Sequence, residues 1–193
     1  MGEVDIRIIG SRSAVDAAEE IIQSELAPYI ITTEEKELED VIVQLLTVQR
    51  ATLATAESCT GGLLANRVTN VPGSSAVFVE GNVTYSNDAK TRTLGVSAEL
   101  ICTVGAVSEE VARAMAEGAL RRSGANFALS TTGIAGPDGG TAQKPVGTVY
   151  VGLTSRASAT QVEKLFFPTD RQAFKRICTQ HALDMLRKRL LGI

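Results

Sequence analysis

From about residue 50 onward, short strand-like segments alternate with amphipathic helical segments, and this alternation most limits the folds open to the chain. Strand patterns rich in apolar and β-branched residues span 52–56, 77–85, 125–131, 147–154 and 161–167. Helical patterns separate the first three of these segments and follow the last. Strands joined through helices pair in parallel, whereas the last two are close enough to form a hairpin. The sequence therefore predicts an α/β protein, a three-layer α/β/α sandwich with a mixed sheet.

The first 32 residues have a different pattern. Residues 4–9 alternate like a strand, residues 13–26 are helical in pattern, and residues 29–31 favour a second short strand. A βαβ unit of this size is too small to bury a core of its own. We therefore expect a small βαβ unit at 1–32, which packs against other structure, and a main domain at 33–193.

Composition excludes several classes of protein. The net charge is −3 with no basic stripe, so nucleic acid is not expected to be the main ligand. No apolar run approaches the ~18–20 residues of a membrane span, and residues 1–10 lack the pattern of a secretory signal. Three cysteines without a CxxC pair favour a reducing, cytoplasmic setting. Because His181 is the single histidine, we expect neither a metal site nor a cofactor.

The segment Glu-Ser-Cys-Thr-Gly-Gly at 57–62 stands between a predicted strand and a predicted helix. Backbone N–H groups at a helix start are unpaired within the helix and can stabilise an anion. A hydroxyl at Ser58 beside such donors has the arrangement that acyl transfer needs. Cys59 is a competing nucleophile by position. The alternative is a capped turn with Ser58 or Thr60 as N-cap and Gly61 as a turn residue.

The segment Thr-Tyr-Ser-Asn-Asp-Ala-Lys at 84–90 ends the second predicted strand. A lysine can act as the base for a serine when burial or nearby charge lowers its pKa. Lys90 is the candidate base, and Tyr85 could relay a proton or orient the amine. The alternative is an ordinary helix start, capped by Ser86 or Asn87, with Lys90 exposed.

A loop with four glycines at 131–140 follows the third predicted strand. Gly133 and Gly136 allow the backbone to approach a phosphate or a ribose closely. The spacing matches neither a Walker A loop nor a dinucleotide-binding fingerprint. The alternative is a long ordered connection without a ligand.

Two weaker candidates lie elsewhere. Pro-Gly-Ser-Ser at 72–75 is a turn that presents the hydroxyls of Ser74 and Ser75. Arg171, in the first turn of the last predicted helix, could pair with a phosphate.

Together these motifs resemble the CinA C-terminal domain family. The segments that carry the resemblance are, in order, AESCTGGL, PGSSAVF, VTYSN with AK, LGV, GAVSE, MAEGAL, TGIAGPDGG and KPVGTV, covering about residues 34–190. The resemblance implies an α/β/α fold, often dimeric. It also implies hydrolysis of nicotinamide mononucleotide to nicotinate mononucleotide and ammonia, an activity found in stand-alone members of that family.

The resemblance also implies roles for individual residues. Ser58 matches the nucleophile, and Tyr85 and Lys90 match its activating pair. Among the candidate substrate contacts, Thr132, Ser75 and Arg171 match by motif; the full set is Cys59, Thr60, Gly61, Ser74, Ser75, Thr132, Gly133, Gly136 and Arg171.

Residues 1–32 resemble the end of the domain that precedes this module in longer members of the family, so the chain is expected to be a piece of a longer protein. A non-catalytic module that senses a nucleotide or binds a partner is the alternative function. Such a module would need none of Ser58, Tyr85 and Lys90. An amidase acting on another nicotinamide or nucleoside amide is a third possibility.

Overall fold

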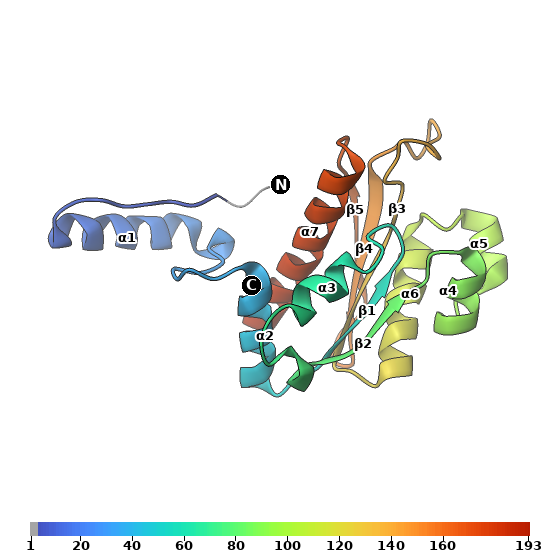
Figure 1. Ribbon diagram of the computed structural model, residues 1–193, viewed down its shortest axis with the longest axis horizontal. Coiled ribbons are helices and arrows are strands. Elements are labelled where there is room, and N and C mark those ends of the chain that lie inside the picture. Colours follow the sequence, from blue (N-terminus) through green and yellow to red (C-terminus); the bar gives the residue numbers. More distant parts are fainter. Residues whose placement is uncertain (1–3) are drawn as a thin grey trace.

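The computed structural model describes residues 4–193, and its centre is a five-stranded sheet (Figure 1). In spatial order the strands are β2 (Phe78–Val83), β1 (Leu53–Glu57), β3 (Phe127–Gly133), β4 (Thr148–Ser155) and β5 (Gln161–Phe166). β1 pairs in parallel with β2 and β3, whereas β4 pairs antiparallel with β3 and β5. The predicted mixed sheet and its late hairpin are confirmed.

Helices cover both faces of this sheet (Figure 1). α2 (Leu38–Gln49), α3 (Leu63–Thr69) and α7 (Arg171–Leu191) lie on one face. α4 (Asn87–Leu94), α5 (Ala98–Val104) and α6 (Glu109–Ser123) lie on the other. Because successive strand residues point to opposite faces, Leu53 joins the core under α7 while Ala54 joins the core under α6. The predicted three-layer sandwich is confirmed.

The pairing of β1 with β2 contains a bulge. Leu53 lies opposite Phe78, but Ala54 lies opposite Glu80, so Val79 is an extra residue in β2. Beyond the bulge the register is regular up to the pair Glu57 and Val83. The carboxyl ends of β1, β2 and β3 therefore meet at one edge of the sheet.

The predicted βαβ unit at the N-terminus is wrong in its strands and right in its helix. α1 (Arg12–Leu26) forms, but residues 4–9 have no regular structure, and residues 27–29 form the 3-10 helix η1 (Ala27–Tyr29). A strand needs a hydrogen-bonded neighbour, and within residues 4–193 no strand pairs with either segment. α1 buries no residue and extends away from the sandwich (Figure 1). The domain boundary after residue 32 stays a prediction.

Arg187 of α7 fastens the segment that follows α1 to the main domain. Its side chain is 1% exposed, and its guanidinium donates to the carbonyls of Pro28 (2.8 Å) and Ile30 (3.0 Å). Asp184 completes the arrangement by accepting from Nε at 2.8 Å. A buried guanidinium is stable only when its donors are satisfied, so this contact fixes residues 28–30.

Close packing of α6 against α4 depends on Gly118, which gives a prediction for stability. A Cβ atom on Gly118 would lie 2.1 Å from the carbonyl oxygen of Leu94, a backbone atom that cannot turn away. We expect Gly118→Ala to lower the free energy of unfolding by about 2–3 kcal/mol, measured by denaturant unfolding. Gly10→Ala is the matched control, since its Cβ would meet only Ala14 at 3.4 Å. Equal stability of the two variants would contradict the packing.

None of the helices in residues 4–193 has both the length and the apolar character needed to cross a membrane.

Candidate functional site

Ser58 occupies the first position after β1, at the edge where three strands end. Its N–H donates to the Thr131 carbonyl of β3 at 2.9 Å. On the other side, the Thr84 N–H donates to the Glu57 carbonyl at 2.8 Å. Ladder-like hydrogen bonds on both sides therefore hold the backbone at Ser58, whose side chain is nearly buried.

Lys90 reaches Ser58 from α4. Ser86 caps this helix by accepting from the Ala89 N–H at 3.1 Å. The Lys90 side chain is 1% exposed, and its Nζ lies 3.0 Å from Ser58 Oγ. The same nitrogen donates to the carbonyls of Thr84 (2.9 Å) and Tyr85 (3.3 Å). The alternative of an exposed Lys90 is wrong.

Burial shifts Lys90 toward its neutral form. It lowers the pKa of the ammonium, because the charged form loses its hydration. A neutral amine has two N–H groups and one lone pair. Two carbonyls and one hydroxyl surround Nζ, so the amine can donate twice and accept from Ser58 Oγ.

Cys59 is held in the thiol form. Its side chain is buried, and this burial raises the pKa of the thiol to about 12. Because the thiolate is the reactive form of cysteine, the environment disfavours Cys59 as nucleophile. Of the two nucleophiles considered from the sequence, Ser58 is the one with a base in contact.

A buried carboxylate, Glu57, organises the turn that follows Ser58. One of its oxygens accepts from the Thr60 hydroxyl (2.7 Å) and from the N–H groups of Gly62 and Leu64 (both 3.0 Å). The other oxygen accepts from the Ala65 N–H at 2.8 Å. Glu57 thus caps α3 from inside the sheet, a role that the sequence analysis missed. Glu57 ends β1 and lies six residues before α3, so the sequence had no local capping signal for this role.

The backbone N–H groups of the turn differ in their partners. The Gly61 N–H donates to the Ser58 carbonyl at 3.1 Å, which closes a tight turn. Across residues 4–193, neither a carbonyl nor another residue's side chain accepts from the N–H groups of Cys59 and Thr60. Both residues are buried, Thr60 at 0% exposure and Cys59 at 5%.

Tyr85 is placed differently from the expected proton relay. Its side chain is 60% exposed, and its hydroxyl accepts from Arg171 Nη2 at 2.7 Å. Arg171 Nη1 donates to the Gly136 carbonyl at 2.9 Å. The structure thus brings together Tyr85, Arg171 and Gly136, all three predicted from sequence. The contact of Tyr85 with Lys90 is through its backbone carbonyl, so a relay by its hydroxyl stays a prediction.

Thr132 and Gly133 lie at the end of β3 and have packing contacts. The Thr132 hydroxyl donates to the Ala106 carbonyl at 2.7 Å. A Cβ on Gly133 would lie 2.8 Å from the Thr148 carbonyl oxygen, so only glycine allows the close approach of β4. Their proposed contact with substrate stays a prediction.

Ser74 and Ser75 lie at the opposite end of the sheet. They belong to the 3-10 helix η2 (Ser74–Ala76), which precedes β2, whereas Ser58 follows β1. Since the two strands are parallel, roughly 15–20 Å of strand separates them. Within one chain they do not join the Ser58 site, and the expected dimer stays a prediction.

Lys175 is a second residue that the sequence analysis missed. A Cβ atom on Gly61 would lie 3.5 Å from Lys175 Nζ, so the ammonium is next to the turn that carries Ser58. Lys175 is four residues after Arg171 on α7, and residues so spaced share one helix face. That spacing was the available signal.

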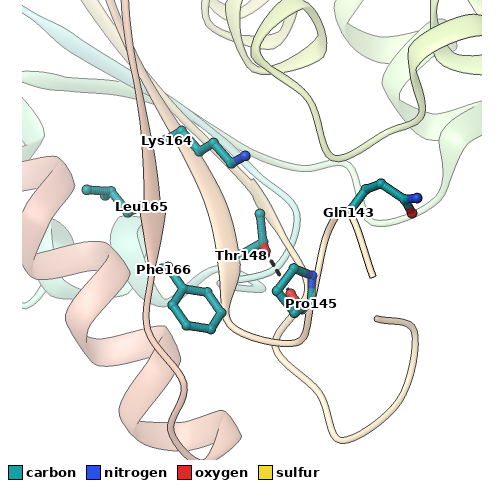
Figure 2. A pocket seen from close by; sticks show the side chains of 6 residues that line it. All are labelled: Gln143, Pro145, Thr148, Lys164, Leu165 and Phe166. Atoms are coloured by element: carbon teal, nitrogen blue, oxygen red, sulfur yellow. Dashed lines mark hydrogen bonds between the residues drawn. The ribbon is translucent and has the colours of Figure 1, made fainter. Parts of the chain in front are cut away.

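Other features lie outside this cluster. A hollow of about 290 Å³ lies beside β4 and β5, and Figure 2 shows side chains that line it. There the Thr148 hydroxyl donates to the Pro145 carbonyl at 2.7 Å. His181 contacts Glu163 at 2.7 Å. In the described part of the chain, no group of three His, Cys, Asp or Glu residues could hold a metal ion.

Comparison with known proteins identifies the family. The family model for the CinA C-terminal domain matches residues 35–190. The chain belongs to the CinA C-terminal domain family. A CinA-like protein of Akkermansia muciniphila is 47% identical over 183 residues, covering 95% of this chain and 44% of that protein. A CinA-like protein of Citrifermentans bemidjiense is 54% identical over 170 residues, covering 88% and 41%. The chain thus spans less than half the length of these CinA relatives.

Solved CinA structures share the fold. The competence/damage inducible protein CihA of Agrobacterium tumefaciens is 41% identical with a TM-score of 0.75, covering 81% of this chain and 98% of that one. A CinA superfamily protein of Klebsiella pneumoniae is 33% identical with a TM-score of 0.77, covering 81% and 97%. The uncovered fifth of this chain is of about the same size as the segment that precedes α2.

Proposed function

We propose that this CinA domain is an amidohydrolase that converts nicotinamide mononucleotide to nicotinate mononucleotide and ammonia. The observation that carries the proposal is the buried contact of 3.0 Å between Ser58 Oγ and Lys90 Nζ. A serine and a desolvated lysine in contact are a nucleophile and its base. A module that only binds a ligand would gain nothing from burying this lysine.

The first half of the reaction forms an acyl-enzyme. The lone pair of Lys90 Nζ takes the Ser58 proton as Oγ attacks the carboxamide carbon. The N–H groups of Cys59 and Thr60, which have no carbonyl partner in residues 4–193, are the proposed donors to the resulting oxyanion. As the intermediate collapses, the C–N bond breaks and the Lys90 ammonium returns its proton to the leaving nitrogen. Ammonia departs, and the acyl group remains on Ser58 as an ester.

The second half frees the acid. Water gives a proton to Lys90 and attacks the ester, and Ser58 Oγ leaves with that proton. The sum is amide plus water to carboxylic acid plus ammonia. The pyridinium charge of the substrate already activates its carboxamide, so an ordinary serine suffices as nucleophile.

The state of Lys90 predicts the pH dependence. Because burial lowers its pKa in the folded protein, kcat/KM should rise with pH and level off above an apparent pKa lower than the ordinary lysine value of about 10.4. Between the folded and the unfolded pKa the unfolded chain binds more protons, so stability also rises with pH in that window. The check is a pH–rate profile corrected for base hydrolysis of the substrate. An activity still climbing at the ordinary lysine pKa would contradict the assignment.

The direct test is ammonia release from nicotinamide mononucleotide, with nicotinate mononucleotide measured as the second product. We expect the two products in equal amounts. Binding of the nucleotide without either product would instead favour the sensing module as the function. Release of ammonia from other amides but not from this one would move the proposal to another substrate.

A further inference from the structure

Lys175 is a cation without a protein partner beside the candidate nucleophile. Its side chain is half-buried, and its Nζ would be 3.5 Å from a Cβ on Gly61. In residues 4–193 its ammonium takes part in no salt bridge or hydrogen bond. Every other lysine of residues 4–193 that is half-buried or buried has a described polar partner: Lys90, Lys144 and Lys188.

The position is electrostatically unfavourable for a cation. Lys175 lies one turn after Arg171, the first residue of α7, where the helix dipole is positive. Arg171 adds a second positive charge on the same face of the helix. Without an anion nearby, these charges repel each other and the helix end.

The neighbouring carboxylates already have other partners. Glu57 accepts its four hydrogen bonds from Thr60 and the start of α3. Asp170 caps α7 by accepting from the N–H groups of Gln172 and Ala173. Lys175 therefore has an unpaired charge to offer an anion that the described part of the chain does not supply.

The distance from the nucleophile suits the far end of a small substrate. Ser58 and Gly61 are the ends of one tight turn, so their Cα atoms are within about 7 Å of each other. An anion on Lys175 would thus lie beside the turn that carries Ser58. In a nucleotide amide the ring and the ribose separate the phosphate from the carboxamide, so the two groups would bind at neighbouring places in one site.

We propose that Lys175 binds the phosphate monoester of the substrate and selects phosphorylated amides over their unphosphorylated counterparts. The inference rests on the amidase proposed above for its substrate, but its binding test does not require turnover. Gly61 contributes by leaving the ammonium open, since it has no side chain and adopts φ +61°.

The kinetic test compares wild type, Lys175→Met and Lys175→Arg on nicotinamide mononucleotide and nicotinamide riboside. Loss of one charged hydrogen bond to phosphate should raise KM for the mononucleotide about 10- to 100-fold, with kcat changed less than about threefold. For the riboside, kcat/KM should be unchanged, and Lys175→Arg should restore most of the mononucleotide affinity. Lys188→Met is the matched control, on the same helix but paired with Asp184 at 2.8 Å.

The binding test measures inorganic phosphate and the mononucleotide by calorimetry on wild type, Lys175→Met and Lys188→Met. We expect both ligands to bind wild type and the control, and to bind Lys175→Met at least tenfold more weakly. Such binding without ammonia release would refute the amidase and leave the phosphate site standing. Turnover with an unchanged KM in Lys175→Met would refute the phosphate site and leave the amidase standing. Absence of phosphate-dependent binding in wild type would also overturn the inference.

Discussion

Replacing Ser58 with alanine is expected to lower kcat for nicotinamide mononucleotide by about 1000-fold or more. The variant keeps the fold but has no oxygen to form the acyl-enzyme, and loss of a nucleophile commonly costs several orders of magnitude in rate. Ser58 is followed by a turn that Glu57 holds, so this turn and the ligand site should persist. The nucleotide should therefore still bind with an affinity within a few-fold of wild type.

The measurement is ammonia release with purified wild type and Ser58→Ala, together with calorimetric binding of the nucleotide. Ser24→Ala is the control, because Ser24 is exposed on α1, outside the sandwich. Cys59 offers an internal check, since a buried thiol with a pKa of about 12 should not replace the serine. Near-normal turnover by Ser58→Ala would end the Ser–Lys proposal.

Glu57→Ala is expected to have the largest effect on stability, lowering the free energy of unfolding by about 3–5 kcal/mol. The substitution leaves one hydroxyl and three backbone N–H groups without their buried acceptor, and each such loss costs roughly 1–3 kcal/mol, partly recovered by water. For a chain of this length the shift in Tm is about 10 °C. Activity should fall as well, because the Cys59–Gly61 turn loses its anchor.

Glu57→Gln separates hydrogen bonding from shape. One oxygen of Glu57 accepts three of the four hydrogen bonds, and the amide oxygen of a glutamine can accept the same three. The glutamine NH2 group would then face the Ala65 N–H, so only that fourth hydrogen bond is lost. We expect its loss of stability to be about half that of the alanine variant, by chemical denaturation. A glutamine variant no more stable than the alanine variant would show that the negative charge, rather than the geometry, matters.

The sequence predicted the layers of this fold because local signals agreed with the packing. Ser86, one of two residues considered as a helix cap, is the N-cap of α4, and Gly95 ends that helix. The N-terminal strands were mispredicted for a physical reason. Alternation of apolar and polar residues at 4–9 favours an extended, pleated backbone. A strand forms only beside a hydrogen-bonded partner, which this segment lacks among the described residues.

The sequence pointed to Ser58 and Lys90, the proposed reactive residues. It did not point to Glu57 and Lys175, which lie around them. Ser58 and Lys90 belong to separate motifs, and the structure brings them into contact. The two could be linked from sequence because a serine nucleophile needs a base, and a lysine can take that role where histidine does not. Their contact, however, depends on which strands are neighbours, and a single sequence does not give strand order. The same holds for Arg171 with Tyr85, and for Ser75, whose place at the far end of β2 follows only from the parallel pairing.

The bulge at Val79 affects the position of Lys90 relative to Ser58. It lies at the end of the sheet remote from Ser58, yet it advances β2 by one residue relative to β1. Without that advance Glu57 would face Asn82 instead of Val83, and α4 with its lysine would begin about 3.3 Å further along. Such a displacement is larger than the 3.0 Å contact it would have to preserve. The distance between Ser58 and Lys90 thus depends on the number of residues in β2 near Phe78. Insertions or deletions there should therefore lower turnover as much as changes beside Ser58 itself.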